Sequence, residues 1–129
     1  MRSDLIARAT AARERAIAPY SGFKVGAALR TAGGKIYDGC NIENASYGLT
    51  VCAERVALLK ALSEGEREFT EIAVVTDAET ATPPCGACRQ LLWEYCGPIT
   101  LHLHSTRGID ESYPLAELLP HPFDRRKLR

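Results

Sequence analysis

Hydrophobic and polar residues follow two different periods along this chain, and the two periods alternate. Residues 3–18 place apolar side chains at helical spacing, so we expect a helix there with Ser3 as its N-cap. Residues 25–31 and 35–42 instead have the composition of strands, and Gly33-Gly34 separates them. That order predicts a β-hairpin after the first helix.

The second half of the chain continues the alternation. Residues 52–63 have helical spacing that Gly65 ends, and the continuously apolar, β-branched run 72–76 is typical of a strand covered on both faces. A helix over 86–95, strands over 99–105 and 110–113, and a short helix over 115–119 complete the predicted elements. Together they predict a three-layer α/β/α fold with a mixed five-stranded sheet, in one domain that spans residues 1–129.

Charge and composition exclude several classes of function. Lys plus Arg and Asp plus Glu both number 16, so no net field favours nucleic acid or a membrane, and only the run 125–129 is locally basic. Charged residues interrupt the first twenty positions, and no apolar run reaches the ~20 residues that span a bilayer. We therefore expect a cytoplasmic protein whose five cysteines are metal ligands or buried thiols, not disulfides.

Cysteines and a glutamate form the most informative pattern. Cys52-Ala53-Glu54 opens one predicted helix, and Cys85-Gly86-Ala87-Cys88 opens another. The positive end of a helix stabilises a thiolate, so these sulfurs suit a metal ion. Three thiolates can hold a tetrahedral zinc ion and leave its fourth position for water, while Glu54 moves the proton of that water.

Simpler interpretations of the same residues exist. A structural zinc site needs a fourth protein ligand, and a redox pair needs no third cysteine. Glu54 alone is typical of a first helical turn, where the helix dipole favours an acid. Arg55 could face solvent, or it could offset the net negative charge of zinc with three thiolates. The candidates for a fourth ligand are Cys40, Cys96, His102, His104 and His121.

Three stretches of the chain resemble one family, the zinc-dependent cytidine deaminases of the small, homotetrameric type. They are residues 20–28, 41–55 and 84–90, within a resemblance that runs from about Tyr20 to Leu119. The resemblance implies that Cys52, Cys85 and Cys88 bind one Zn²⁺ per chain. It also implies that Glu54 is the proton shuttle and that Arg55 supports the metal site, in the variant of the deaminase pattern that has cysteine in place of histidine.

The resemblance also implies which residues bind substrate. Phe23 would pack against the pyrimidine, Asn41 and Glu43 would hold the ribose hydroxyls, and Ala53 would contact the substrate. Without the resemblance, Phe23 would be interpreted as a core aromatic residue and the two polar residues as part of a loop.

The resemblance further implies contacts between subunits and a reaction. In a homotetramer, Phe123 and Tyr47 would reach the site of a neighbouring subunit. The expected reaction is the hydrolytic deamination of free cytidine, and of deoxycytidine, to the uracil nucleoside and ammonia in pyrimidine salvage. Three alternatives remain at this point: a deaminase of another cytosine nucleoside such as blasticidin S, a zinc-stabilised binding module without catalysis, and a nucleic-acid editor.

Overall fold

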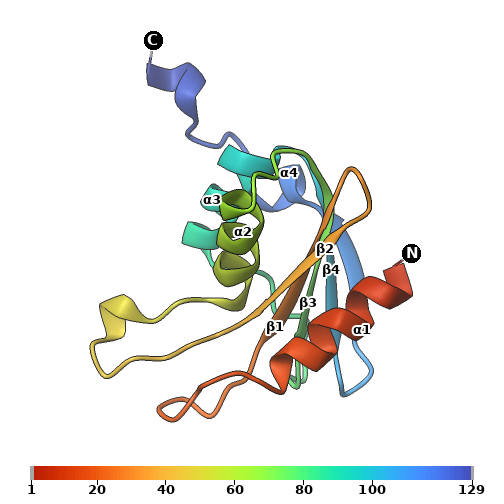
Figure 1. The fold of residues 1–129 in the computed structure, drawn as a ribbon, viewed down its shortest axis with the longest axis vertical. Helices are drawn as coiled ribbons and strands as arrows, with labels where there is room; N and C mark the ends of the chain where they lie inside the picture. Colours follow the sequence, from red (N-terminus) through yellow and green to blue (C-terminus); the bar gives the residue numbers. More distant parts are fainter. Residues whose placement is uncertain (1, 129) are drawn as a thin grey trace.

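The computed structural model describes residues 2–128, so Arg129, the last residue of the basic C-terminal run, lies outside the described residues. Five strands and four α-helices make up the fold, with two short 3-10 helices between and after them (Figure 1). In chain order the elements are α1 (Arg2–Arg13), β1 (Gly26–Thr31), β2 (Ile36–Cys40), η1 (Tyr47–Leu49), α2 (Ala53–Ser63), β3 (Phe69–Thr76), α3 (Gly86–Cys96), β4 (Thr100–Ser105), β5 (Asp110–Pro114), α4 (Leu115–Leu118) and η2 (Arg125–Leu128).

The five strands form one mixed sheet in the order β2-β1-β3-β4-β5. Strands β3 and β4 pair in parallel, and the other neighbouring pairs are antiparallel. Helix α1 lies on one face of the sheet, while α2 and α3 lie on the other (Figure 1). The expected three-layer α/β fold is therefore confirmed. Among the described residues, no helix combines the length and the apolar character needed to cross a membrane.

Strand β3 is buried on both faces, as its continuous apolar sequence predicts. Ile72 and Val74 belong to the larger core beneath α2 and α3, and Ala73 and Val75 belong to the smaller core beneath α1. Because side chains alternate between the two faces of a strand, one apolar run supplies both cores. The sheet is thus fixed in the middle of the molecule, and the ends of its covering helices are fixed with it.

Two glycines let the helices approach the sheet closely. A Cβ atom on Gly26 would lie 2.0 Å from the carbonyl oxygen of Ala9 in α1, and one on Gly39 would lie 2.6 Å from the backbone nitrogen of Ala57 in α2. Only glycine leaves room for backbone at these distances. Helix α2 is therefore seated on β2 by direct contact between their main chains.

The first helix is shorter than its apolar spacing predicts. It ends at Arg13, and the prediction that it continues to residue 18 with Ser3 as N-cap is wrong, because Ser3 lies inside the helix. Ile17 instead forms a bridge with Ile42, in which its N–H donates to the oxygen of Asn41 at 3.0 Å. The nitrogen of Glu43 in turn donates to the oxygen of Ile17 at 2.8 Å. A contact between distant parts of the chain thus outweighs local helical propensity.

Candidate metal centre and active site

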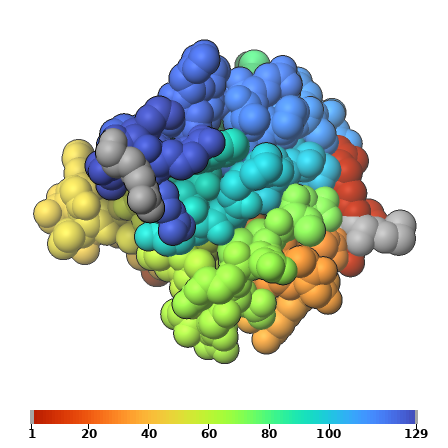
Figure 2. All heavy atoms as spheres, turned by 90° about the horizontal axis from the view of Figure 1, so that it is seen from above, coloured from red at the N-terminus to blue at the C-terminus, as the bar shows by residue number. Residues whose placement is uncertain are grey.

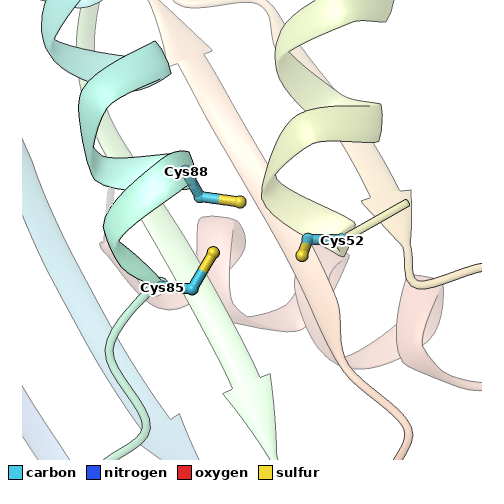
Figure 3. A group of neighbouring side chains, drawn as sticks. All are labelled: Cys52, Cys85 and Cys88. Carbon is cyan, nitrogen blue, oxygen red and sulfur yellow. The ribbon is translucent and has the colours of Figure 1, made fainter. Parts of the chain in front are cut away.

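Three cysteine side chains meet where α2 and α3 begin. Cys52 is the N-cap of α2, Cys85 is the N-cap of α3, and Cys88 lies in the first turn of α3. Their Sγ atoms all lie within 4.8 Å of one another, and the sulfurs point into the same space between the two helix starts (Figure 3). Neither N-cap sulfur accepts a capping hydrogen bond from its own helix. Both sulfurs are therefore available to a common partner.

The donor set fits a zinc ion. Sulfurs about 2.3 Å from a tetrahedral zinc lie about 3.8 Å apart, which is within the separation observed here. The hydrogen bond from Cys88 lowers the pKa of the Cys52 thiol to about 6, although partial burial opposes the change. The same hydrogen bond, together with burial, raises the pKa of Cys88. The sulfurs are thus close enough to share protons, as they would share a metal ion.

Glu54 lies two positions after Cys52 and is almost completely buried, with 6% of its surface exposed. Burial raises the pKa of its carboxyl group to about 7, and the charge of Cys52 raises it further while Arg55 opposes the increase. Its side chain borders the same pocket as Cys52 and Cys85. An acid in this position can accept and release a proton near neutral pH beside the cysteine cluster.

Arg55 lies close enough to this group to lower the pKa of both Cys52 and Glu54 through its charge. Its Nε atom is buried and, among the residues that the structure describes, has no hydrogen-bond partner. A buried donor of this kind is costly unless an acceptor faces it. The residue as a whole is half-buried, and this unpaired donor is available to a negatively charged metal–thiolate group.

A pocket of about 300 Å³ opens in front of the cluster. It brings together residues that are far apart in the sequence, including the four that the sequence assigns to substrate: Phe23, Asn41, Glu43 and Ala53. Seven further residues that line the pocket were not predicted from the sequence. Five of these lie inside the family-like stretches or next to them, whereas Val74 and Thr82 carry no such signal. The seven are Ser21, Val25, Thr50, Val51, Val74, Thr82 and Pro83.

Asn41 and Glu43 hold the chain segment that carries Phe23. The amide oxygen of Asn41 accepts a hydrogen bond from the nitrogen of Val25 at 2.9 Å, and its Nδ2 donates to the oxygen of Phe23 at 2.8 Å. Glu43 Oε1 accepts hydrogen bonds from the backbone nitrogens of Tyr20 and Ser21, at 2.9 and 3.1 Å. Hydrogen bonding by Ser21 lowers the pKa of Glu43 despite some desolvation.

Tyr47 and Phe123 lie outside this pocket. Tyr47 is 76% exposed, contacts Tyr20 edge to face at 6.1 Å between ring centroids, and borders an adjoining hollow of about 310 Å³. Phe123 is 61% exposed on the C-terminal segment that lies over α3 (Figure 2). The indole nitrogen of Trp93 holds that segment by donating to Asp124 at 3.3 Å. Their contribution to a neighbouring subunit stays a prediction.

The alternative of a closed four-ligand site has no support within residues 2–128. The described cysteine, histidine and acidic side chains contain one group of three or more that could hold a metal, and its members are the three cysteines. His102 is engaged elsewhere, with Nε2 2.7 Å from Glu71 Oε1 and Nδ1 2.7 Å from Ser112 Oγ. Burial raises the pKa of Cys96 to about 12, as expected for an inert thiol.

A cysteine cluster that can bind zinc, beside a buried acid and a pocket, defines the class of zinc-dependent hydrolases. Comparison with known proteins gives the family. The chain belongs to the cytidine and deoxycytidylate deaminases, because the family model of their zinc-binding region matches residues 1–100.

Relatives over almost the whole chain agree with this assignment. A cytidine deaminase from Sporosarcina psychrophila is 50% identical over 125 residues, which cover 96% of this chain and 92% of the relative. One from Halalkalibacterium halodurans is 52% identical over 123 residues, which cover 95% and 93%. The crystal structure of cytidine deaminase from Burkholderia pseudomallei superposes with a TM-score of 0.92 at 49% identity, over 95% of this chain and 99% of that one.

A more distant relative bears on the alternative substrate. A blasticidin-S deaminase from Bacillus cereus is 33% identical over 109 residues, which cover 78% of this chain and 77% of the relative. The similarity to cytidine deaminases is both higher and more extensive.

Proposed function

We propose that this chain, as a single catalytic domain, catalyses the zinc-dependent hydrolytic deamination of free cytidine and deoxycytidine in pyrimidine salvage. The observation that carries the proposal is the position of Glu54, which is buried next to the three cysteines and borders the pocket. The activity for which the relatives at about 50% identity are named supports the same reaction.

In this proposal Cys52, Cys85 and Cys88 hold the zinc ion. Zinc, when bound, supplies the Lewis acidity that makes water a nucleophile near neutral pH. Glu54 takes a proton from the attacking water and delivers it to ring nitrogen 3 as the water oxygen adds to ring carbon 4. Glu54 then takes the remaining proton from the hydroxyl group now on carbon 4 and delivers it to the exocyclic amine, the bond between that nitrogen and carbon 4 breaks, and ammonia leaves. The products are ammonia and the uracil nucleoside.

Arg55 compensates charge in this scheme. Three thiolates outweigh the charge of a divalent metal by one unit, which weakens its acidity. The buried Nε of Arg55 and the positive ends of α2 and α3 offset part of that excess.

The other half of the pocket holds the nucleoside. Phe23 packs against the pyrimidine, Asn41 and Glu43 bind the ribose hydroxyls, and Ala53 contacts the base. A phosphate on the 3′-oxygen would meet the carboxylate of Glu43, so free nucleosides fit this pocket better than polynucleotides do.

A homotetramer completes the site in our proposal. Exposed apolar side chains include Tyr20 and Tyr47 at the adjoining hollow and Phe123 and Leu128 in the C-terminal segment, and exposed apolar patches are typical of contacts between subunits. Tyr47 and Phe123 are the two that would reach a neighbour's site. We assign the activity to the cytoplasm, where thiol ligands stay reduced.

The decisive test removes the proton shuttle. Glu54→Gln should keep the fold and the zinc content while the loss of cytosine absorbance from cytidine slows by about a thousandfold or more. Glu64→Gln, at the exposed C-terminal end of the same helix, is the matched control and should retain activity. Substantial turnover by Glu54→Gln would contradict the mechanism, and faster turnover of blasticidin S than of cytidine by the unaltered protein would contradict the substrate.

A further inference from the structure

The hydroxyl group of Ser21 joins two parts of the nucleoside pocket. It lies in hydrogen-bond contact with Glu43 Oε2, and it accepts a hydrogen bond from the backbone nitrogen of Phe23 at 3.0 Å. A carboxylate can only accept hydrogen bonds, so the single hydroxyl proton points to Glu43. The direction of both bonds is therefore fixed: Phe23 donates to Ser21, and Ser21 donates to Glu43.

The peptide groups of Phe23 are held from two sides. Ser21 accepts from its N–H, and Asn41 donates to its carbonyl oxygen at 2.8 Å. Gly22 makes the intervening turn possible, since its φ of +71° is a backbone conformation that favours glycine. The position of the aromatic ring is thus coupled to the two polar residues assigned to the ribose.

The hydrogen-bond capacity of Glu43 limits what a ligand can offer it. A carboxylate has about four acceptor positions. Two backbone N–H groups occupy two positions on Oε1, and the Ser21 hydroxyl occupies one on Oε2. The remaining position on Oε2 can accept one more donor, which suits a hydroxyl group of a sugar.

We propose that Ser21 is a positioning residue for nucleoside binding, which orients Glu43 toward a ribose hydroxyl and ties that orientation to the backbone of Phe23. The inference rests on the proposed function, because it concerns the ribose half of the same pocket. Ser21, Glu43 and Thr50 also border both the nucleoside pocket and the adjoining hollow, so they form the boundary between the two.

Truncation of Ser21 should remove this link without removing the turn. The hydrogen bonds from the Tyr20 and Ser21 nitrogens to Oε1 involve backbone and would persist in Ser21→Ala, as would the contacts of Asn41. The variant would leave Oε2 free to rotate away from the ribose and the Phe23 N–H without its acceptor. The cysteines and Glu54 would be untouched, so binding should weaken while the chemical step stays intact.

The experiment compares steady-state kinetics of the zinc-loaded protein on cytidine and on 3′-deoxycytidine. For Ser21→Ala we expect KM for cytidine to rise about tenfold, with kcat within about twofold of the unaltered protein. Ser21→Thr keeps the hydroxyl and should restore KM. 3′-Deoxycytidine lacks the 3′-hydroxyl that Glu43 would bind, so on this substrate Ser21→Ala should raise KM by about twofold or less. Ser63→Ala, an exposed serine at the end of α2, is the matched control.

Several results would overturn the inference. One is a KM for cytidine that Ser21→Ala leaves unchanged, and another is an equal loss of kcat/KM on both substrates, which would indicate a purely structural role. If Ser21→Ala melts well below the unaltered protein, Ser21→Cys takes its place in the experiment, because a thiol is similar in size but only a weak hydrogen-bond donor. An unchanged KM for cytidine in Ser21→Cys would again contradict the role. If the unaltered protein fails to deaminate cytidine, the proposed function is wrong and this inference with it. If the unaltered protein is active but Ser21→Ala leaves KM unchanged, only the inference is wrong.

Discussion

Gly39→Ala tests whether close packing of β2 against α2 holds the metal centre in place. The added Cβ atom would lie 2.6 Å from the nitrogen of Ala57, 2.8 Å from the oxygen of Ala53 and 2.9 Å from the Cβ of Val56. Real Cβ contacts are longer, and two of these partners are backbone atoms that cannot rotate away. Helix α2 must therefore move off the sheet or β2 must bend.

The expected cost is that of overpacking a core, about 1–3 kcal/mol of unfolding free energy. The displacement occurs in the first turns of α2, next to Cys52 and Glu54. Since a misplacement of about 1 Å can cost about a hundredfold in rate, we expect turnover of cytidine to fall by about tenfold or more. Stability and activity should thus decrease together, although residue 39 does not border the pocket.

The assay combines urea unfolding at a fixed subunit concentration with cytidine turnover and zinc content. Gly33→Ala is the matched control, because a Cβ on Gly33 would meet nothing closer than Thr31 Oγ1 at 3.8 Å, an ordinary contact. If Gly39→Ala unfolds at the same urea concentration as the unaltered protein and turns over cytidine at the same rate, the close approach of β2 and α2 does not position the site.

Two further predictions concern the metal site, and a third concerns an ion pair on the sheet, away from the metal site. Arg55→Ala should retain fold and zinc but lower kcat by about tenfold, because a compensating charge beside Cys52 and Glu54 is lost. Unchanged kinetics with zinc still bound would refute that role. Incubation with a chelator should abolish turnover, and added zinc should restore it; activity that persists at zero zinc content would contradict the cofactor assignment. Burial raises the pKa of Glu71, but hydrogen bonds with His102 and Arg30 outweigh it and leave the pKa below its ordinary value of 4.5. The ionised Glu71 carboxylate therefore stabilises the fold fully above pH 4.5, and this stabilisation is lost as pH falls through the lower pKa of the folded state. The free energy of unfolding of Glu71→Gln, measured in urea, should depend less on pH across this acidic range than that of the unaltered protein.

Local patterns in the sequence predict most of the fold because most elements have a clear apolar pattern or are bounded by glycine. Gly65 lies two residues after the end of α2 and Gly97 directly after the end of α3, and their φ angles of +96° and +68° are those found where helices end. Strand β3 extends to Phe69, three residues before its β-branched run begins. The two helix ends therefore need no information beyond their own residues, whereas the start of β3 depends on its pairing with β1.

Long-range contacts account for the differences. Helix α1 ends early because Ile17 pairs with Ile42, and η1 and η2 were not predicted because neither has an apolar period of its own. The cysteine cluster could be predicted because both halves open predicted helices. Val74 and Thr82 could not be assigned to the pocket, because only the folded sheet brings them beside Phe23.

The pocket combines two halves that the fold supports in different ways. Cys52, Glu54 and Cys88 stand at helix starts packed against the central sheet, and Glu54 and Cys88 are buried. Ser21 and Glu43 lie in surface segments that hydrogen bonds, not a core, hold together. Substitutions in the first half should therefore disturb metal binding or the proton transfer, whereas substitutions in the second should change KM and the choice of nucleoside. Single substitutions in each half, assayed with cytidine, would separate the two halves by whether kcat or KM changes. The two halves line the same pocket, but different parts of the fold hold them in place.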